Sequence, residues 1–394
     1  MLIGLLLAVS LRAAHELVGA GVLPALVAAL SGETLAGAFF AVFSAASGLG
    51  ILCGGLSADR FGPARTFAAG LAGFALGMLA TGFAPSMPVV IAARALEGFA
   101  AGMFSCVVSA VVMRAYDDAA RPRVLAWMSA AWVVPGLLAP AGAVSAAARF
   151  GWRAVFLGLV PLVAIAALLV LPRLLRLGGS ARSGGSPASP FSVLGDRALR
   201  AALATRALVV VAFFGVESFL PLATERVLGA SNAQKALLLT LSALFWTAGA
   251  FAQARWNSRL SPTAHARLGA ALLVAGIAVA VSALARLLPL EAALAAWPFA
   301  GLGMGIVYQA ATTAAMRTSH EGSEGATGAA LGITDALSIA GSTALCGAFL
   351  AREPLARGSV PVSLLVGFAL VAGAGLASIA TAKRLRAASA AASA

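Results

Sequence analysis

The chain has 394 residues, of which 61% are hydrophobic and only 10% are charged, and its mean hydropathy is +0.97. Soluble globular proteins carry about 25% charged residues, so these values exclude a soluble protein and predict a membrane protein. The net charge of +13 is compatible with nucleic-acid binding. We attribute it instead to membrane orientation, because the arginines stand in short loops between apolar runs, and we expect no nucleic-acid partner.

Apolar runs of membrane-spanning length follow one another along the chain. A helix needs roughly 20 apolar residues to cross a bilayer, and the runs lack the alternation of β-barrel strands. We therefore expect an all-α polytopic membrane protein, whose first span begins near residue 2 and is not a signal peptide. Breaks at charges, glycine and proline predict twelve transmembrane helices, at 2–30, 34–57, 64–84, 86–114, 122–147, 152–172, 199–224, 233–254, 264–288, 290–315, 325–351 and 359–383.

Lysine and arginine are divided unequally between the two sides of the predicted membrane. We assign residues 54–65 to one side of the membrane and let the chain change sides at each span. The loops on that side then contain 18 of the 27 basic residues, a count that includes Arg206, and the loops on the other side contain 7. Because cytoplasmic loops carry the excess of positive charge, we expect both termini in the cytoplasm. The Ala- and Arg-rich composition favours a bacterial source, and hence a multi-pass protein of the inner membrane.

The longest connection is "RLLRLGGSARSGGSPASPFSVLGDRALR", residues 173–200. Its Gly, Ser, Pro and Arg content predicts a flexible cytoplasmic linker. We therefore expect an N-terminal six-helix bundle at 1–172, a linker at 173–198 and a C-terminal six-helix bundle at 199–394.

The sequences of the two predicted bundles are similar to each other at an offset of about 200 residues. Glu16 corresponds to Glu217, "EGFAAGMF" at 97–104 to "AGLGMGIV" at 300–307, and "ADRFGPAR" at 58–65 to "NSRLSPTA" at 257–264. Three matches in the same order predict two pseudo-symmetric six-helix halves. Secondary transporters built from such repeats bind their substrate between the halves near the bilayer midplane.

The stretch "GLSADRFGPAR", between the second and third predicted spans, resembles the signature loop of the major facilitator superfamily. The matching residues are Gly55, Asp59, Arg60, Gly62 and Arg65, with Pro63 and Ala64 where basic residues are usual. The resemblance implies the major facilitator fold and a latch that holds the cytoplasmic gate shut. We expect Asp59 to cap the following helix or to pair with an arginine; the alternative is a turn that only sets topology.

Two further stretches resemble motifs of the same family. "RALEGFAAG", 94–102, resembles an Arg-containing motif of proton-coupled members. "PGLLAPAGA", 135–143, is similar to the Gly-Pro motif of exporting antiporters, with Ala139 and Ala143 where glycine is usual. The resemblance therefore implies proton coupling and export.

Charged residues inside spans are functional candidates, because each costs at least roughly 2.5–3.5 kcal/mol on insertion scales. Arg12 lies four residues before Glu16, and Arg94 three residues before Glu97, so each couple can pair within its helix. Glu217 and Asp335 have no basic residue within a turn, and we predict that they are unpaired and exchange a proton. The predicted proton-coupling residues are Glu16, Glu217, Asp335, Arg94 and Glu97. The alternatives are structural pairs and, for Asp335 and especially Glu217, a water-exposed position near a cavity mouth.

Polar and aromatic residues near mid-span are candidates for lining a substrate cavity, although packing is the alternative for each of them. They are Arg12, His15, Trp132, Phe213, Phe214, Trp246, Tyr308 and Gln309. Such a cavity, apolar and aromatic with a few acids, favours amphipathic or cationic organic compounds. The scarcity of basic residues at mid-span argues against polyanions, and the lack of Asn and Gln rings argues against sugars.

These observations favour a drug:proton antiporter. The alternative transporter is a proton-coupled importer of a small organic acid, with Arg94 or Arg12 binding the carboxylate. The spans lack catalytic pairs and metal-ligand sets, and no Walker motif occurs, so we expect no enzyme, cofactor, metal site or ATP dependence. A receptor or scaffold would not need unpaired buried acids. The expected partners are a small-molecule substrate, protons and the lipid bilayer, and we expect a monomer.

Overall fold

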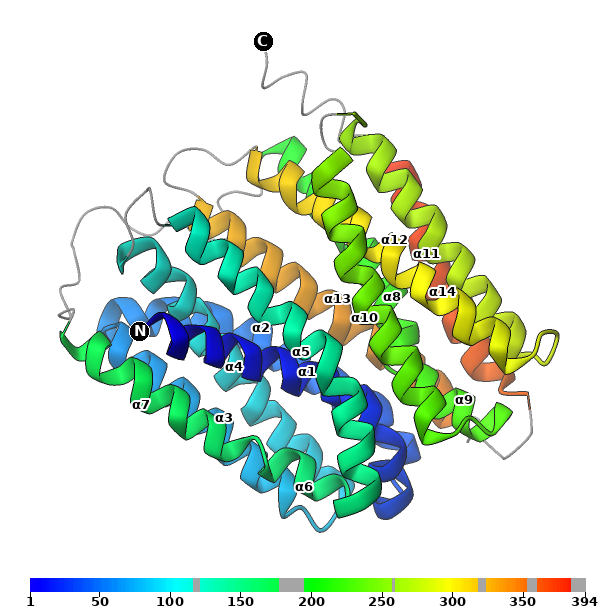
Figure 1. Ribbon diagram of the computed structural model, residues 1–394, viewed down its shortest axis with the longest axis horizontal. Coiled ribbons are helices and arrows are strands. Elements are labelled where there is room, and N and C mark those ends of the chain that lie inside the picture. The colour runs from blue at the N-terminus through cyan, green and yellow to red at the C-terminus, as the bar shows by residue number, and fades with distance from the viewer. Residues whose placement is uncertain (116–120, 177–194, 257–258, 318–323, 353–359, 384–394) are drawn as a thin grey trace. The chain divides into compact units, whose positions relative to one another are not determined.

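The computed structural model describes residues 1–115, 121–176, 195–256, 259–317, 324–352 and 360–383 (Figure 1). These ranges are helical apart from short turns, and no strand occurs within them. The predicted all-α class is therefore confirmed. Most of the predicted linker, and the last residues of the chain, lie outside the described ranges.

Contacts along the chain define two compact units. The first unit comprises Met1–Gly32 and Val42–Pro187. Its helices are α1 (Leu2–Leu30), α2 (Ala36–Phe61) from Val42 onward, α3 (Pro63–Gly82), α4 (Met87–Ala115), α5 (Arg121–Phe150), α6 (Trp152–Leu157) and α7 (Val160–Arg176). Within this unit α3 packs along α4, and α1 packs along α5.

The second unit comprises Glu33–Ala41 and Ala188–Ala394. It holds the short 3-10 helix η1 (Glu33–Leu35) and the first residues of α2. The helices that follow are α8 (Arg197–Glu217), α9 (Leu220–Leu228), α10 (Asn232–Trp256), α11 (Pro262–Leu284), α12 (Leu290–Arg317), α13 (Glu324–Arg352) and α14 (Val362–Thr381). Helix α12 packs along α10 and α11, and α8 contacts α12, α13 and α14. The predicted boundaries of the two six-helix halves stay a prediction.

Eleven helical segments of the described chain are long and apolar enough to cross a membrane. Helix α5, with 30 residues, occupies the place of the fifth predicted span, so the order of long helices matches the predicted order. Two predicted spans each consist of two helices: α6 and α7 replace 152–172, and α8 and α9 replace 199–224.

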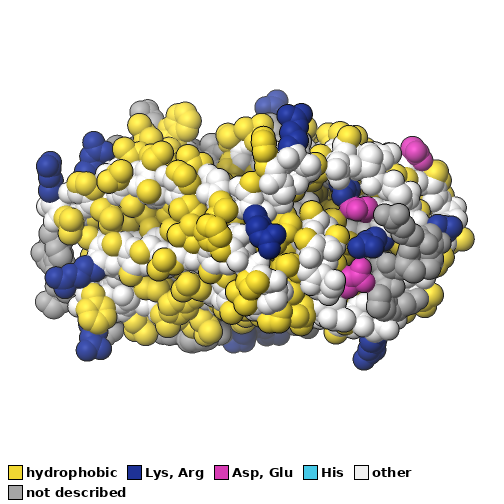
Figure 2. All heavy atoms as spheres, turned by 90° about the horizontal axis from the view of Figure 1, so that it is seen from below, with side chains coloured by type: hydrophobic (Ala, Val, Ile, Leu, Met, Phe, Trp, Pro, Cys, Tyr) yellow, Lys and Arg dark blue, Asp and Glu magenta, His cyan; other side chains and the backbone are white. Residues whose placement is uncertain are grey.

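The outer surface is apolar. Hydrophobic side chains are spread over the middle of the face seen in Figure 2, while most charged groups lie toward its edges. Leu76, Leu168 and Phe251 are exposed by 59%, 74% and 71%, an arrangement that is stable only where lipid replaces water.

Glycines bring helices of the first unit into backbone contact. A Cβ atom added at Gly98 in α4 would lie 2.0 Å from the carbonyl oxygen of Phe43 in α2, and one added at Gly102 would lie 2.1 Å from that of Ser47. Real Cβ atoms do not approach so closely, so only glycine permits this crossing. Small residues at helix crossings are a common basis of packing in membranes.

The second unit repeats these contacts. A Cβ atom at Gly301 in α12 would lie 2.3 Å from the carbonyl oxygen of Ser242 in α10, and one at Gly305 would lie 2.0 Å from that of Trp246. These glycines follow their counterparts in α4 by 203 residues, and the contacted α10 residues follow theirs in α2 by 199. The predicted correspondence of "EGFAAGMF" with "AGLGMGIV" is thus confirmed at the level of individual backbone contacts.

We predict that Gly98→Ala destabilises the protein by about 1–3 kcal/mol, because the added methyl group forces α4 away from α2. Gly341→Ala in α13 is the matched control, since no atom lies within 4 Å of its added Cβ; we expect it to be neutral or slightly stabilising. Thermal unfolding in detergent measures both. Equal stability of the two variants would contradict the proposed crossing.

Candidate functional site

Ionisable side chains of the first unit form one group, which we call the ionic cluster. Its members are Arg12, His15 and Glu16 of α1 and Arg94 and Glu97 of α4. At its centre Arg94 Nη1 donates to Glu97 Oε2 over 2.9 Å, and His15 Nε2 lies 2.9 Å from the same oxygen. Thr81 Oγ1 donates to Glu97 Oε1 over 2.6 Å. The buried carboxylate therefore receives hydrogen bonds from Arg94 and Thr81 and contacts His15, as a charge away from water requires.

Both predicted local pairs are present in this cluster. Arg94 and Glu97 form a close buried pair. Arg12 Nε lies 3.9 Å from Glu16 Oε2, while the Arg12 guanidinium also donates to the hydroxyls of Ser105 and Ser47. The arginines of the cluster are thus engaged within their own unit.

His15, which we predicted to contact the substrate, is enclosed within the first unit. Its side chain is fully buried, and its ring centroid lies 5.0–5.7 Å from those of Phe43, Phe74 and Phe156. Nε2 is also within hydrogen-bonding distance of Arg94. Rings and guanidinium fill the space around the imidazole, and His15 therefore belongs to the ionic cluster.

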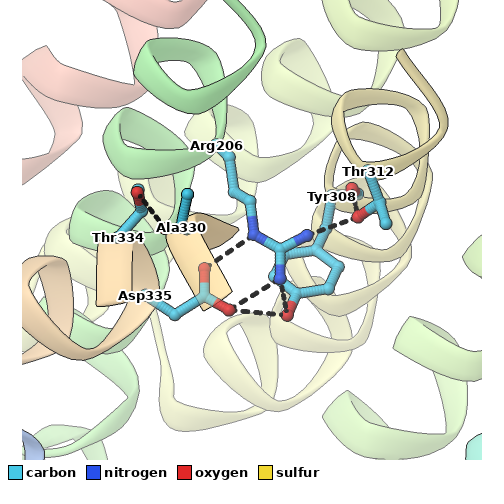
Figure 3. Close-up of polar contacts among 6 residues, drawn as sticks. All are labelled: Arg206, Tyr308, Thr312, Ala330, Thr334 and Asp335. Carbon is cyan, nitrogen blue, oxygen red and sulfur yellow. Dashed lines mark hydrogen bonds and ion pairs between the residues drawn. The ribbon is translucent and has the colours of Figure 1, made fainter. Parts of the chain in front are cut away.

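Asp335 of α13 has a cationic partner, which corrects the prediction that it is unpaired. Arg206 of α8 forms a bidentate pair with it, with Nε and Nη2 each 2.7 Å from a carboxylate oxygen (Figure 3). Tyr308 of α12 donates its hydroxyl to Asp335 Oδ2 over 2.9 Å, and Arg206 also bonds to the hydroxyls of Tyr308 and Thr312. The partner was missed because it stands 129 residues earlier, on another helix.

Arg206 is a functional candidate that the sequence reasoning counted with the loop residues. Helix α8 begins at Arg197, where the Asp196 side chain accepts hydrogen bonds from the first backbone amides. Arg206 therefore stands well inside the helix, and only 5% of it is exposed. Residue 206 lies within the predicted span 199–224, and this position could have identified Arg206 as a charged residue inside the membrane.

Glu217 is the last residue of α8, directly before the break that separates α8 from α9. Trp297 of α12 donates its indole N–H to Glu217 Oε2. Among the described residues no lysine or arginine forms an ion pair with Glu217, in agreement with the prediction. Trp297 was not among the predicted site residues.

Five aromatic rings of the second unit form a group, which we call the aromatic cluster. Its members are Phe213 and Phe214 of α8, Trp246 of α10, and Trp297 and Tyr308 of α12. Phe213 stacks on Trp297 with centroids 5.6 Å apart, and Trp246 lies 5.2 Å from Phe213 and 5.4 Å from Tyr308. Tyr308 in turn lies under the Arg206 guanidinium, 3.7 Å from its central carbon.

The aromatic cluster therefore connects two acids. Glu217 contacts it at Trp297, and Asp335 contacts it at Tyr308. Four predicted substrate residues (Phe213, Phe214, Trp246 and Tyr308) come together here. Gln309 is partly buried and bonds to no described residue, and the Trp132 side chain lies outside the described part of α5.

The connection between the second and third predicted spans, expected at 58–63, is a single residue. Helix α2 continues to Phe61, and α3 starts at Pro63 with Gly62 as its N-terminal cap, at a φ of 87°. Only glycine adopts this conformation readily. Asp59 stands exposed in the last turn of α2, and no side chain caps α3, so the expectation that Asp59 caps it is wrong. Arg60 and Arg65 are exposed as well, and neither they nor Asp59 forms an ion pair with a described residue.

Solved transporter structures share this fold. A D-xylose–proton symporter matches with a TM-score of 0.74 at 16% identity, and the alignment covers 96% of each chain. An inward-facing bacterial homologue of the human lysosomal transporter Spinster matches with a TM-score of 0.71 at 17% identity, over 98% of this chain and 96% of the other. At these identities the likeness concerns the fold alone.

Curated relatives match shorter parts of the chain. A probable multidrug-efflux transporter of Mycobacterium tuberculosis is 30% identical over 179 residues, which are 45% of this chain and 38% of the relative. A triacylglyceride transporter of Mycolicibacterium hassiacum is 34% identical over 117 residues, 29% of this chain and 22% of the relative. The matched segments thus span less than half of each relative's length.

A family model covers most of the chain. The model described as Major Facilitator Superfamily matches residues 5–343, which include the ionic cluster, the aromatic cluster and Asp335. The chain therefore belongs to the Major Facilitator Superfamily and is a multi-pass membrane transporter.

Proposed function

We propose that the protein is a proton-coupled exporter of amphipathic or cationic organic compounds, a drug:proton antiporter that works by alternating access. We place it in a bacterial inner membrane, as a monomer with both termini in the cytoplasm. The observation that carries this proposal is the aromatic cluster with a carboxylate at each end.

The chemistry of the aromatic cluster suits a cationic or amphipathic ligand. Ring faces attract cations by about 0.5–2 kcal/mol, more where water is excluded, and they also bury apolar surface. Phe214, Trp246 and Tyr308 are partly exposed and so available to a ligand, and Glu217 at one edge supplies a counter-charge.

Proton coupling follows from competition at a carboxylate. Glu217 has two uncharged hydrogen-bonding neighbours, the Trp297 indole and the Ser242 hydroxyl. Because neither carries a charge, its carboxylate can bind either a proton or a ligand cation. Occupancy by one excludes the other, which links outward movement of the ligand to inward movement of the proton. Asp335 is the second candidate, and it takes part only when Arg206 releases it.

The relatives and the arginines favour export over the alternative importer. One relative that matches part of the chain is named a multidrug-efflux transporter. Import of an organic acid requires a base that is available for the substrate carboxylate. Arg12, Arg94 and Arg206 instead bond to acids and hydroxyls of their own units.

We predict that Glu217→Gln abolishes gradient-driven transport while downhill exchange of the substrate persists, because the amide mimics the protonated acid and cannot release a proton. Asp335→Asn should reduce accumulation to a smaller extent. Uptake of tetraphenylphosphonium by inverted vesicles, with and without a pH gradient, measures both. Glu291→Gln is the control, since Glu291 is an exposed acid in the first turn of α12.

Full gradient-driven transport by both variants, and by Glu16→Gln, would exclude these acids as coupling residues. Proton coupling would then have to depend on Glu97, or the antiporter proposal would be replaced by that of a uniporter.

We predict that Trp246→Ala weakens binding of tetraphenylphosphonium about tenfold, the effect of losing roughly 1.4 kcal/mol of ring contact. Trp256→Ala at the exposed end of the same helix should bind like the wild type. Equilibrium dialysis of the purified proteins gives both constants. Equal affinity of the two variants would place the ligand elsewhere.

We predict that Asp59→Asn impairs transport more than it impairs expression, because the latch that the family resemblance implies needs the charge. The measurement compares the transport rate per molecule in the membrane. An unchanged rate would show that the turn only sets topology.

A further inference from the structure

The two units place different residues at equivalent positions around an acid. The offset of 203 residues, established by the glycine contacts, puts Trp297 of α12 where α4 has Arg94. It likewise puts Ala300 where α4 has Glu97. The ionic pair of α4 therefore has no counterpart in α12.

An independent contact supports this register. A Cβ atom at Gly77 in α3 would lie 3.0 Å from the backbone nitrogen of Glu97, and one at Gly276 in α11 would lie 3.1 Å from that of Ala300. The crossing of α3 with α4 is thus repeated by α11 with α12, and Ala300 occupies the place of Glu97.

Helices α1 and α8 show the same contrast at an offset of 201 residues. Glu16 corresponds to Glu217, whereas Arg12 corresponds to Phe213 and His15 to Val216. Of the five residues of the ionic cluster, the second unit therefore retains only the acid of the first helix. An uncharged residue replaces each of the other four.

The retained acids consequently have opposite surroundings. Glu16 lies 3.9 Å from Arg12 and also within electrostatic range of Arg94, in a cluster whose two arginines balance its two glutamates. Glu217 receives a hydrogen bond from the uncharged indole of Trp297.

We propose that the neutral indole at position 297 makes Glu217, and not its counterpart Glu16, the carboxylate that exchanges the proton. This inference rests on the proposed function and names the residue that determines its coupling site. Trp297 is a positioning residue: its N–H holds Oε2, and because indole is a donor only, Oε1 receives the proton or the ligand cation.

The charged groups of the helices around α8 are otherwise occupied in the described structure. Arg206 pairs with Asp335, Lys235 with Glu225, and Arg226 with Glu33. Arg286 donates to the carbonyl oxygen of Val227. Other described charges of these helices stand near helix ends: Arg197, Arg200, Arg255, Arg267, Glu291, Arg317, Arg352 and Lys383. The buried His265, in the first turn of α11, has its Nδ1 3.2 Å from the carbonyl oxygen of Ser261.

The test is an infrared titration of the full-length protein in lipid vesicles, following the carbonyl stretch of protonated carboxyl groups across neutral pH. We expect a titrating band in the wild type that is lost in Glu217→Gln and retained in Glu16→Gln. Trp297→Arg should also abolish it, since a cation at position 297 holds Glu217 ionised. Trp297→Phe keeps a neutral ring, and so should keep the band with a shifted midpoint.

Two results would overturn the proposal: loss of the band in Glu16→Gln but not in Glu217→Gln, or an unchanged band in Trp297→Arg. The two glutamine variants decide the question even where Trp297→Arg fails to fold. The titration requires no transport. A wild type that titrates at Glu217 but moves no tetraphenylphosphonium would refute the proposed export and leave this inference standing.

Discussion

The structure depends on the cost of placing a charge in hydrocarbon, because every ionisable side chain in the helices must find a partner there. The first unit meets this requirement with the ionic cluster, in which Arg94 and Thr81 donate hydrogen bonds to Glu97. The second unit meets it with the bidentate pair of Arg206 and Asp335. Glu217 instead receives a hydrogen bond from the neutral indole of Trp297. We propose that Glu217 exchanges the proton because it lacks a cationic partner among the described residues.

A repeated backbone carries these different side chains. Glycines such as Gly98 and Gly301 allow the same helix crossings in both units, so the backbone around the two clusters is held alike. At equivalent backbone positions the first unit carries the ionic cluster and the second unit carries the aromatic cluster. We infer that the ionic cluster stabilises the first unit, while the aromatic cluster of the second unit carries ligand and proton binding.

The sequence predicted the helices, the repeat and the local pair of Arg94 with Glu97, because these depend on spacing along the chain. It did not predict partners that lie on different helices. Asp335 looked unpaired since Arg206 stands 129 residues away, and Trp297 drew no attention because a lone tryptophan in an apolar run is indistinguishable from packing. Asp59 looked like a helix cap because the sequence did not reveal that α2 continues to Phe61.

The central claim is that a proton and a cationic ligand compete for Glu217. The most direct measurement is proton release when tetraphenylphosphonium binds to the purified protein in weakly buffered detergent solution. The account predicts release from the wild type and, from Glu217→Gln, binding without release. Equal proton release from both proteins, at equal occupancy by the ligand, would contradict it.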